Sequence, residues 1–262
     1  MGKLVFFVLR DDTGDLQISC SKSSLKDADF RLAKKLDYGD IVVADGPVGA
    51  TNKGEICIWA DHISLHSKSL APPPGKHHGL ADEELRARRR YVDMYANPEA
   101  LEKFQKRSWI VSSIRKFMES RKFLEVETPM MQSIAGGAAA RPFETYHNAL
   151  SLNLFLRIAP ELYLKRLLVG GMKRVFEINR NFRNEGISRK HNPEFTMLEA
   201  YEAFGNHETM LNLTEEMIRC VAKEISSNNG IIRWEEGEIN YTKDFVRKTY
   251  ADCFKDALGF SM

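Results

Sequence analysis

Hydrophobic and polar positions alternate along the first 66 residues in runs that predict strands. The runs lie at 3–11, 16–21, 40–51 and 55–67, and turn-forming stretches rich in Asp, Asn and Gly divide each pair. Residues 24–36, between the two pairs, have the spacing of a short helix. This order makes most of a small closed barrel, whereas a five-stranded OB-fold requires a further strand upstream. We therefore expect an N-terminal OB-fold β-barrel that is incomplete in this chain.

The next stretch, residues 67–96, predicts a linker followed by a charged helix. Its three consecutive prolines, Pro72 to Pro74, interrupt regular structure and are typical of a semi-rigid spacer. The basic run at 86–90 suits either a solvated helix face or a contact with a phosphate backbone, and solvated faces are the commoner use of such runs. A second, larger domain is expected from residue 97 onward.

The hydrophobic spacing of this second domain predicts long helices interleaved with strands. Helical spacing, strict alternation and the helix-bounding residues Pro160 and Gly170 define the expected elements. In chain order these are a helix at 101–121, a strand at 123–128, a helix at 160–170, strands at 174–183 and 194–203, and a helix at 205–227. Because the strands look antiparallel, the pattern indicates an α+β fold rather than a series of βαβ units.

Composition narrows the class of protein without selecting a function. The 262 residues are 43% hydrophobic and 28% charged, and the net charge of +2 gives no uniform basic field for nucleic acid. The four cysteines are scattered without a CxxC pair, so neither a zinc site nor a disulfide framework is indicated, and a reducing cytoplasm is expected. The apolar run near the N-terminus soon meets charge, so we expect no signal peptide and no membrane span.

One predicted strand carries a carboxylate on the face expected to be buried. Phe195, Met197, Glu199 and Tyr201 are two residues apart and share a face that is apolar apart from the acid. A carboxylate held there requires a cationic partner or several hydrogen-bond donors. Arg183 offers that cation in a structural pair, and the alternative is that the cation is a ligand.

The strand before it has one apolar and one polar face. Phe176, Ile178 and Phe182 share the first face with Arg180. A second face that is polar throughout is, on pattern alone, as consistent with a half-exposed strand as with a buried one. The residues of this polar face are Glu177, Asn179, Asn181 and Arg183.

Several stretches resemble the motifs of a known enzyme family. Residues 182–201, FRNEGISRKHNPEFTMLEAY, are similar to motif 2 of class II aminoacyl-tRNA synthetases, and residues 122–131, KFLEVETPMM, are similar to their motif 1. Residues 136–186 resemble lysyl-tRNA synthetases in particular, and the likeness runs through the whole chain. The resemblance implies an OB-fold anticodon-binding domain at 1–66, a linker and charged helix at 67–96, and the N-terminal half of an antiparallel-sheet catalytic domain, with motifs 1 and 2 only, at 97–262.

The resemblance implies a two-step reaction, in which ATP activates lysine to lysyl-adenylate and the lysine then moves to tRNA(Lys). Because the lysine carboxylate attacks the α-phosphorus in line, the protein mainly positions two anions and neutralises charge. Arg183 matches the catalytic arginine of motif 2, whose fork spans the carboxylate and the α-phosphate. Mg²⁺ ions are expected at the phosphates, with no metal ligands within this chain. The implied ATP contacts are Arg183, Glu185, His191, Asn192 and Phe195.

The resemblance also implies an amino-acid pocket made of Gly137, Glu161, Arg183, Glu199 and Tyr201. Glu199 and Tyr201 match residues that face the lysine side chain, which accounts for a buried acid. Glu161 matches the residue that takes the α-amino group, although an acid in the first turn of a helix is also favoured by the helix dipole. Gly137 matches a glycine whose backbone lies against the substrate, and by itself it suits a plain loop.

Two further sites follow from the resemblance. Phe6 and Gln17 match positions at which subclass IIb synthetases stack on and hydrogen-bond to anticodon bases. From the residues alone, Phe6 is more readily a core residue. Motif 1, within residues 101–129, implies a homodimer.

The sequence also departs from the family. It contains no glycine-rich third motif with an adenine-capping arginine, and the family continues for roughly two hundred residues more, an ordinary domain size. We therefore expect complete catalysis by this chain alone to fail. The alternative function is a catalytically inactive tRNA- or protein-binding synthetase fragment. Relatives that lysylate proteins lack the barrel, and aspartyl and asparaginyl relatives bind shorter polar side chains.

Overall fold

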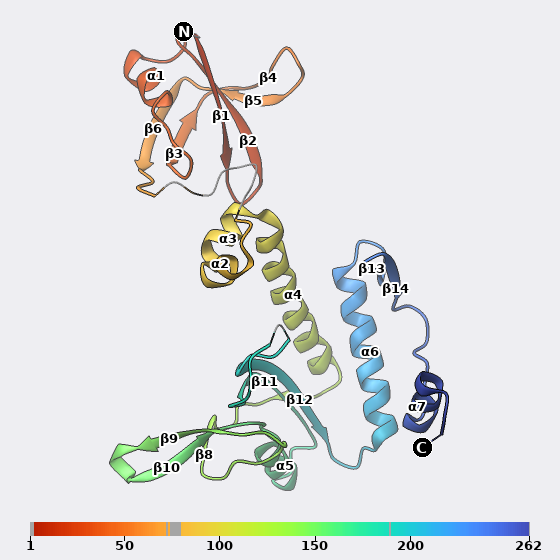
Figure 1. The fold of residues 1–262 in the computed structure, drawn as a ribbon. Coiled ribbons are helices and arrows are strands. Elements are labelled where there is room, and N and C mark those ends of the chain that lie inside the picture. Colours follow the sequence, from red (N-terminus) through yellow and green to blue (C-terminus); the bar gives the residue numbers. More distant parts are fainter. Residues whose placement is uncertain (1–2, 72, 74–79, 189, 262) are drawn as a thin grey trace. The chain divides into compact units, whose positions relative to one another are not determined.

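The fold of the chain is given by a computed structural model, which describes residues 3–71, 73, 80–188 and 190–261. The chain divides into two compact units, Met1–Glu102 and Lys103–Met262 (Figure 1). Most of the proline-rich part of the predicted linker lies outside the described residues. No helix among the described residues is long and apolar enough to cross a membrane.

The described residues of the first unit up to Asn97 form two small sheets and three short helices. A four-stranded sheet has the order β1-β2-β5-β4, and β3 pairs with β6. The described strands close into no barrel, as expected for an incomplete OB-fold. The run predicted at 40–51 divides into two strands at Gly46 and Pro47, because proline has no backbone N–H to donate to a ladder. The elements are β1 (Leu4–Arg10), β2 (Asp15–Ser21), α1 (Asp27–Ala33), β3 (Ile41–Asp45), β4 (Val48–Ala50), β5 (Ile56–Trp59), β6 (His62–Ser67), α2 (Glu83–Arg88) and α3 (Arg90–Ala96).

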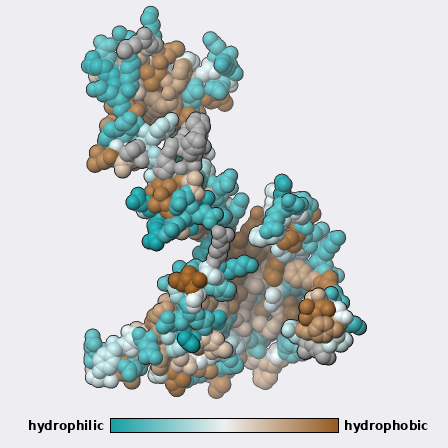
Figure 2. Space-filling model, in the orientation of Figure 1, coloured by the Kyte–Doolittle hydropathy of each residue, from teal (hydrophilic) through white to brown (hydrophobic). Residues whose placement is uncertain are grey.

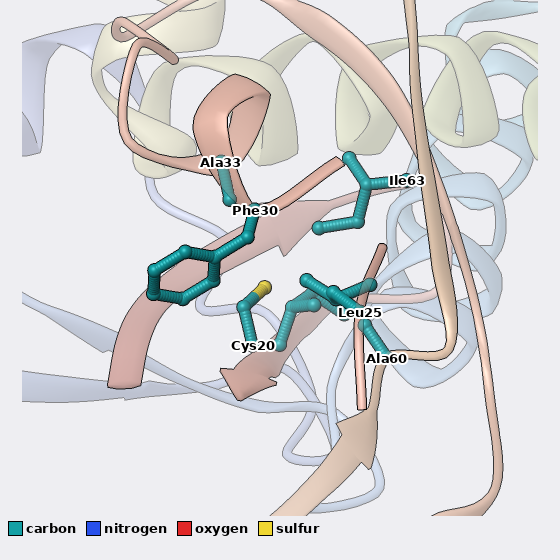
Figure 3. Packing of buried hydrophobic residues seen from close by; sticks show 7 residues of the cluster. Cys20, Leu25, Phe30, Ala33, Ala60 and Ile63 are labelled. Atoms are coloured by element: carbon teal, nitrogen blue, oxygen red, sulfur yellow. The ribbon is translucent and has the colours of Figure 1, made fainter. Parts of the chain in front are cut away.

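The core of the first unit lies between its strands and α1. Cys20 of β2, Phe30 of α1 and Ile63 of β6 are buried against one another (Figure 3). Alternate residues of β1, namely Val5, Phe7 and Leu9, pack on the same cluster. The period-two pattern therefore directs one face of β1 inward and leaves the residues between them on the outer face.

The described part of the second unit combines a three-stranded mixed sheet, a three-stranded antiparallel sheet, the antiparallel pair β13–β14 and helices. The mixed sheet has the order β12-β11-β7 and the antiparallel one the order β8-β10-β9. Helix α4 begins just before the boundary between the units. The elements are α4 (Pro98–Ser120), β7 (Leu124–Glu125), β8 (Met131–Gln132), β9 (Phe143–His147), the 3₁₀ helix η1 (Asn148–Leu150), β10 (Leu152–Leu156), α5 (Glu161–Val169), β11 (Arg174–Phe182), β12 (Glu194–Glu202), α6 (His207–Ile225), β13 (Ile231–Trp234), β14 (Gly237–Asn240) and α7 (Tyr250–Leu258).

Most boundaries predicted in the second unit are confirmed to within a few residues. Pro160 caps the start of α5 and Gly170 caps its end, as helix-bounding residues should. One prediction in this unit is wrong in extent, because the strand expected at 123–128 is only the two-residue β7.

A prediction in the first unit is also wrong in extent. The charged helix expected before residue 97 is broken into α2 and α3 at Arg89, whose φ of −116° and ψ of 57° are not helical.

The apolar face of the β11–β12 pair is covered by helices. Phe176 of β11 is fully buried in a cluster with Phe117 and Met118 of α4, and Leu198 of β12 and Met217 of α6 pack against that cluster. Burying each large apolar side chain contributes roughly 1.5–3 kcal/mol. The helices thus hold this sheet from one side and leave its other face to carry polar residues.

Apolar side chains also remain on the surface of both units (Figure 2). Phe6 and Val8 on β1, Trp109 on α4 and Leu124 on β7 are exposed. Where exposed apolar side chains form a contiguous patch, the surface is typical of a site that binds a ligand or another protein.

Candidate active site

The candidate active site is the face of the β11–β12 pair that lies opposite the helices. In the antiparallel register Glu177 pairs with Glu199, Asn179 with Met197, and Asn181 with Phe195. Directly paired residues of neighbouring strands point to the same side of the sheet, with Cβ atoms about 5 Å apart. The register therefore joins the polar face of β11 and the Glu199-bearing face of β12 into one surface.

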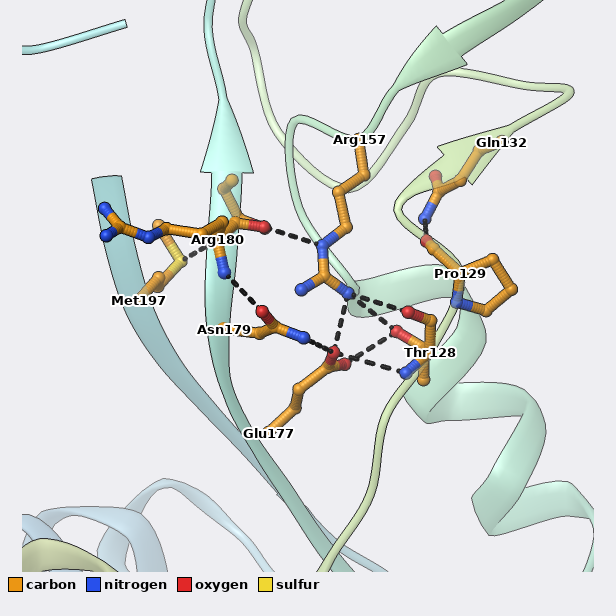
Figure 4. A network of polar contacts seen from close by, with 9 residues as sticks. Thr128, Pro129, Gln132, Arg157, Glu177, Asn179, Arg180 and Met197 are labelled. Atoms are coloured by element: carbon orange, nitrogen blue, oxygen red, sulfur yellow. Dashed lines mark hydrogen bonds and ion pairs between the residues drawn. The ribbon is translucent and has the colours of Figure 1, made fainter. Parts of the chain in front are cut away.

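A buried ion pair forms the floor of this surface (Figure 4). Arg157, between β10 and α5, and Glu177 have side chains that are 0% and 1% exposed, and Arg157 Nη1 donates to Glu177 Oε1 at 2.7 Å. Thr128 Oγ1 donates to Glu177 Oε2 at 2.6 Å, and Arg157 Nε donates to the Arg180 carbonyl at 2.9 Å. Breaking such a pair typically costs 3–5 kcal/mol, because the remaining charge stays buried without a partner.

Sequence reasoning missed Arg157, and it left the burial of Glu177 open. The half-exposed reading of the polar face is wrong for Glu177 and Asn181, each of which is buried. One signal was present, since Arg157 interrupts the apolar run LNLFLRIAP at 152–160. An arginine inside such a run requires a buried acid as partner, but alternation alone cannot say which acid it meets.

Glu199 lies on this surface with its carboxylate partly buried. Tyr201 Oη donates to Glu199 Oε2 at 3.0 Å. Burial raises the pKa of Glu199, the nearby Glu161 and Glu177 carboxylates raise it further, and the Tyr201 hydroxyl and Arg157 oppose the rise. Burial together with the Glu199 charge raises the pKa of Tyr201 well above its usual value. Excess negative charge therefore gathers at Glu199, which favours a cationic ligand.

Arg183 is not the counter-ion of Glu199. No ion pair joins these two side chains among the described residues, and the cation that lowers the pKa of Glu199 is Arg157. The Arg183 guanidinium instead lies over the Phe195 ring, 5.2 Å from its centroid. Its Nε atom is buried without a hydrogen-bond partner in the described part of the chain. An unsatisfied buried donor is costly, so this atom suits an anionic ligand.

Glu161 and Gly137 lie close together at the start of α5. Glu161 opens α5, and its carboxylate accepts from Lys165 Nζ at 2.5 Å. Gly137 has a φ of 91°, and a Cβ atom there would lie 2.9 Å from Glu161 Cβ. Only glycine meets both conditions at this position. The charge of Glu161 raises the pKa of Glu199 and that of Tyr201, so these three side chains lie close enough to interact electrostatically.

The loop between β11 and β12 is exposed. Glu185, His191 and Asn192 all have exposed side chains. His191 and Ser188 pair through their backbones, and the His191 Nδ1 atom lies 2.8 Å from Ser188 Oγ. The structure thus brings Glu161, Glu199 and Tyr201 near one another and pairs Arg183 with Phe195. The other three predicted ATP contacts are exposed on the connecting loop.

Phe6 and Gln17 share the outer face of the sheet in the first unit. Phe6 pairs with Ser19, and Val8 with Gln17, while the neighbouring β1 residues face the core. Phe6 is 51% exposed, so its assignment to the core from the residues alone is wrong. An exposed aromatic beside a glutamine is suited to stack on and hydrogen-bond with a base.

The described residues offer no metal centre of their own. No group of three His, Cys, Asp or Glu side chains among them could hold a metal ion. Among the residues that the structure describes, the side chains of this face therefore form no complete Mg²⁺ site by themselves.

Comparison with known proteins places both units. The model of "tRNA synthetases class II (D, K and N)" matches residues 82–261, and that of "OB-fold nucleic acid binding domain" matches residues 1–65. The chain is 57% identical to the lysine–tRNA ligase of Pelotomaculum thermopropionicum, over 99% of this chain and 51% of that protein. It is 56% identical to that of Carboxydothermus hydrogenoformans, over 98% of this chain and 53% of that protein, and 52% identical to that of Syntrophomonas wolfei, over 98% and 52%. The chain spans about half the length of these curated relatives.

Proposed function

Because this chain belongs to the class II tRNA synthetases of the D, K and N group, we propose that it carries the lysine pocket and the anticodon platform of a lysine–tRNA ligase. In this reaction lysine and ATP give lysyl-adenylate and pyrophosphate, and transfer of the lysyl group to tRNA(Lys) then releases AMP. The observation that carries this proposal is Glu199, a partly buried carboxylate that forms no ion pair with any described residue. It lies on a face whose other acid, Glu177, is already paired with Arg157.

Lysine is recognised at both of its amino groups. Glu199, oriented by Tyr201, binds the ε-ammonium group, and Glu161 binds the α-ammonium group after its carboxylate leaves Lys165. The left-handed backbone of Gly137 keeps the space beside Glu161 clear of a side chain. An aspartate or asparagine side chain would leave the Glu199 charge unpaired, and unpaired buried charge is a strong basis for discrimination.

Arg183 is the catalytic residue of the adenylation step. Its unsatisfied Nε donor and planar fork suit the lysine carboxylate and the α-phosphate together, holding nucleophile and electrophile in line while it neutralises their charge. Phe195 supports the adenine from below. Glu185, His191 and Asn192 close over ATP from the exposed loop, Glu185 near the adenine and His191 near the outer phosphates. Mg²⁺ ions would neutralise charge on the ATP phosphates, and the described residues contribute no group of three metal ligands to hold them.

The remaining assignments are proposals of the same kind. The division into 1–66, 67–96 and 97–262 separates an anticodon-binding domain, a linker and the first half of a catalytic domain. Phe6 and Gln17 contact anticodon bases. A homodimer through residues 101–129 is supported by the exposed Trp109 and Leu124, whose apolar surface a second copy would cover. We propose a cytoplasmic location, because charged tRNA is used there in protein synthesis.

Pyrophosphate exchange tests this function directly. The chain, and the chain joined to the part of the Pelotomaculum thermopropionicum relative that it does not cover, are each incubated with ATP, labelled pyrophosphate and one amino acid at a time. Lysine should stimulate exchange in the joined protein far more than aspartate or asparagine. If the joined protein binds tRNA but exchanges with no amino acid, the binding-only alternative replaces the proposal.

A further inference from the structure

The outer face of the sheet in the first unit carries a second aromatic side chain that no part of the proposed function uses. Phe6 on β1 pairs with Ser19 on β2, and Ser19 pairs with Trp59 on β5. Paired residues point to the same side of a sheet, so these three side chains form a row across it. With strands about 4.8 Å apart, the α-carbons of Phe6 and Trp59 are about 10 Å apart. Phe6 and Trp59 are therefore the residues on either side of Ser19 in this row.

Gly49 sets the position of the Trp59 ring. Gly49 pairs with Cys57, two residues before Trp59 on β5, and so lies on the same face. A Cβ atom at Gly49 would lie 2.8 Å from Trp59 Nε1 and 2.9 Å from Cδ1. The indole therefore occupies the space that a side chain on β4 would take. It lies against the outer face over β4 and remains partly exposed.

Ser19, between Phe6 and Trp59 in this row, has a buried hydroxyl group that forms no hydrogen bond with any described residue. Its side chain is on the outer face, yet the residue is only 1% exposed, and its Oγ atom has no hydrogen-bond partner within the described residues. A buried hydroxyl without a partner is unfavourable, and such groups in native proteins require an explanation. A ligand that inserts between Phe6 and Trp59 and offers a hydrogen-bonding edge would satisfy it.

We propose that Trp59 and Ser19 extend the base-binding face of Phe6 and Gln17 by one further base of a single-stranded RNA loop. The indole stacks on that base, and the Ser19 hydroxyl pairs with its polar edge, since every base has a face for stacking and an edge with donors and acceptors. This inference rests on the proposed anticodon-binding role of the first unit. It adds to that role the Trp59 indole as a second stacking ring and the Ser19 hydroxyl as a hydrogen-bonding group for the base.

Tryptophan fluorescence reports on this contact in the intact chain. The chain has three tryptophans, so Trp109→Phe and Trp234→Phe leave Trp59 as the sole emitter. The probe is a labelled hairpin RNA whose loop carries the triplet complementary to a lysine codon, and the control RNA is a fully paired duplex. Hairpin binding is followed independently by the anisotropy of the label. We expect Trp59 emission to be quenched along the same binding curve with the hairpin and not with the duplex.

Substitutions test Trp59, Ser19 and Gly49, the glycine against which the indole of Trp59 lies. Trp59→Ala should weaken hairpin binding by about fivefold to 150-fold, the range for stacking one base. Gly49→Val, which displaces the indole, should weaken it similarly while far-UV circular dichroism stays unchanged. Ser19→Ala should weaken binding severalfold and raise the melting temperature, because it removes an unsatisfied buried group. Tyr38→Ala, at an exposed aromatic outside this sheet, is the control and should change neither property.

The outcomes separate this inference from the function on which it rests. Hairpin binding by anisotropy with unchanged Trp59 emission would overturn the inference and leave the anticodon role standing. This readout holds even where Trp59→Ala fails to fold. Absence of hairpin binding, with Trp59 intact and the protein folded, would overturn both. Quenching that survives Phe6→Ala but is lost with Gly49→Val would support the contact at Trp59 itself.

Discussion

The sheets of the two units use their faces in opposite ways. In the first unit, the apolar face of β1 packs on the core, and Phe6 lies on a face open to solvent. In the second, the β11–β12 pair has helices on its apolar face, and the face that carries Glu177 and Glu199 is buried or partly buried as well. Both arrangements follow from a period of two, but Phe6 is half exposed on its face whereas Glu177 is buried on the other.

The difference suits the two ligands that we propose, a base for the first surface and an ammonium group for the second. A base is held by stacking on a ring, which works on an exposed surface and tolerates neighbouring water. An ammonium group is distinguished by a countercharge, which is strong only where water is partly excluded and the other charges are already paired. The Arg157–Glu177 pair meets that condition by neutralising the acid next to Glu199. Substitutions should therefore cost more on the enclosed face than on the open one.

The largest effect is expected at the floor of the enclosed face. Arg157→Met leaves Glu177 buried without its cation and should lower the free energy of unfolding of the chain by about 3–5 kcal/mol. Urea denaturation followed by circular dichroism measures this. The control is Arg88→Met, which removes an exposed i,i+4 pair with Glu84 and should cost less than about 1 kcal/mol. Arg157→Met with Glu177→Gln should recover much of the loss, and equal costs for the two arginines would contradict the comparison.

The next largest effect is on amino-acid choice. Glu199→Gln keeps the shape of the pocket and removes the countercharge, so kcat/KM for lysine in pyrophosphate exchange by the joined protein should fall at least about a hundredfold, while KM for ATP changes little. Glu194→Gln, at an exposed acid on the opposite face of the same strand, should leave the exchange unchanged. An unaltered kcat/KM for lysine in Glu199→Gln would remove Glu199 from the pocket.

A smaller effect is expected on the open face. Phe6→Ala should weaken charging of tRNA(Lys) by about 1–3 kcal/mol, the value of one base stacked on an aromatic ring. Pyrophosphate exchange and the melting temperature should stay close to those of the unchanged protein, because the ring is half exposed and lies on the face away from the core. Parallel losses in charging, exchange and melting temperature would show that Phe6 acts through the fold.

The smallest effect concerns the pH dependence of stability. Burial raises the pKa of Glu199 in the folded chain, so this group favours folding below the pKa of the unfolded chain, and that contribution is lost as pH rises through the raised pKa. Above this window, Glu199→Gln should therefore have a higher melting temperature than the unchanged chain. The corresponding gain in the free energy of unfolding should be less than about 1 kcal/mol, because the group is only partly buried. Below the window the two should differ least. A difference that is independent of pH would contradict the charge-based reading of this site.

Lysine binding should follow the opposite trend with pH. The ammonium group pairs with the ionised carboxylate, so affinity for lysine in the joined protein should fall as pH drops through the raised pKa of Glu199. Calorimetric titration of lysine across this range measures the trend. The same titration with Glu199→Gln should show little dependence in that window.

The sequence by itself determined the local elements and the chemistry that they carry. Alternation located β11 and β12 to within one residue and placed Glu199 among apolar neighbours, because a strand repeats every two residues whatever its surroundings. Pro160 and Gly170 bounded α5 because their backbone restrictions act locally. The family resemblance that the sequence carries is confirmed by the match to residues 82–261.

The tertiary structure decided which faces are enclosed and which charges meet. Arg157 lies 20 residues before Glu177, in a different segment, and only the folded chain brings the two together. The same holds for Gly137 against Glu161, and for Trp59 in a row with Phe6 through the pairing of three strands. Burial and ion pairing depend on contacts between segments far apart in the chain, which a local period does not encode. The outward position of Phe6 and the burial of Glu177 were therefore decided by packing.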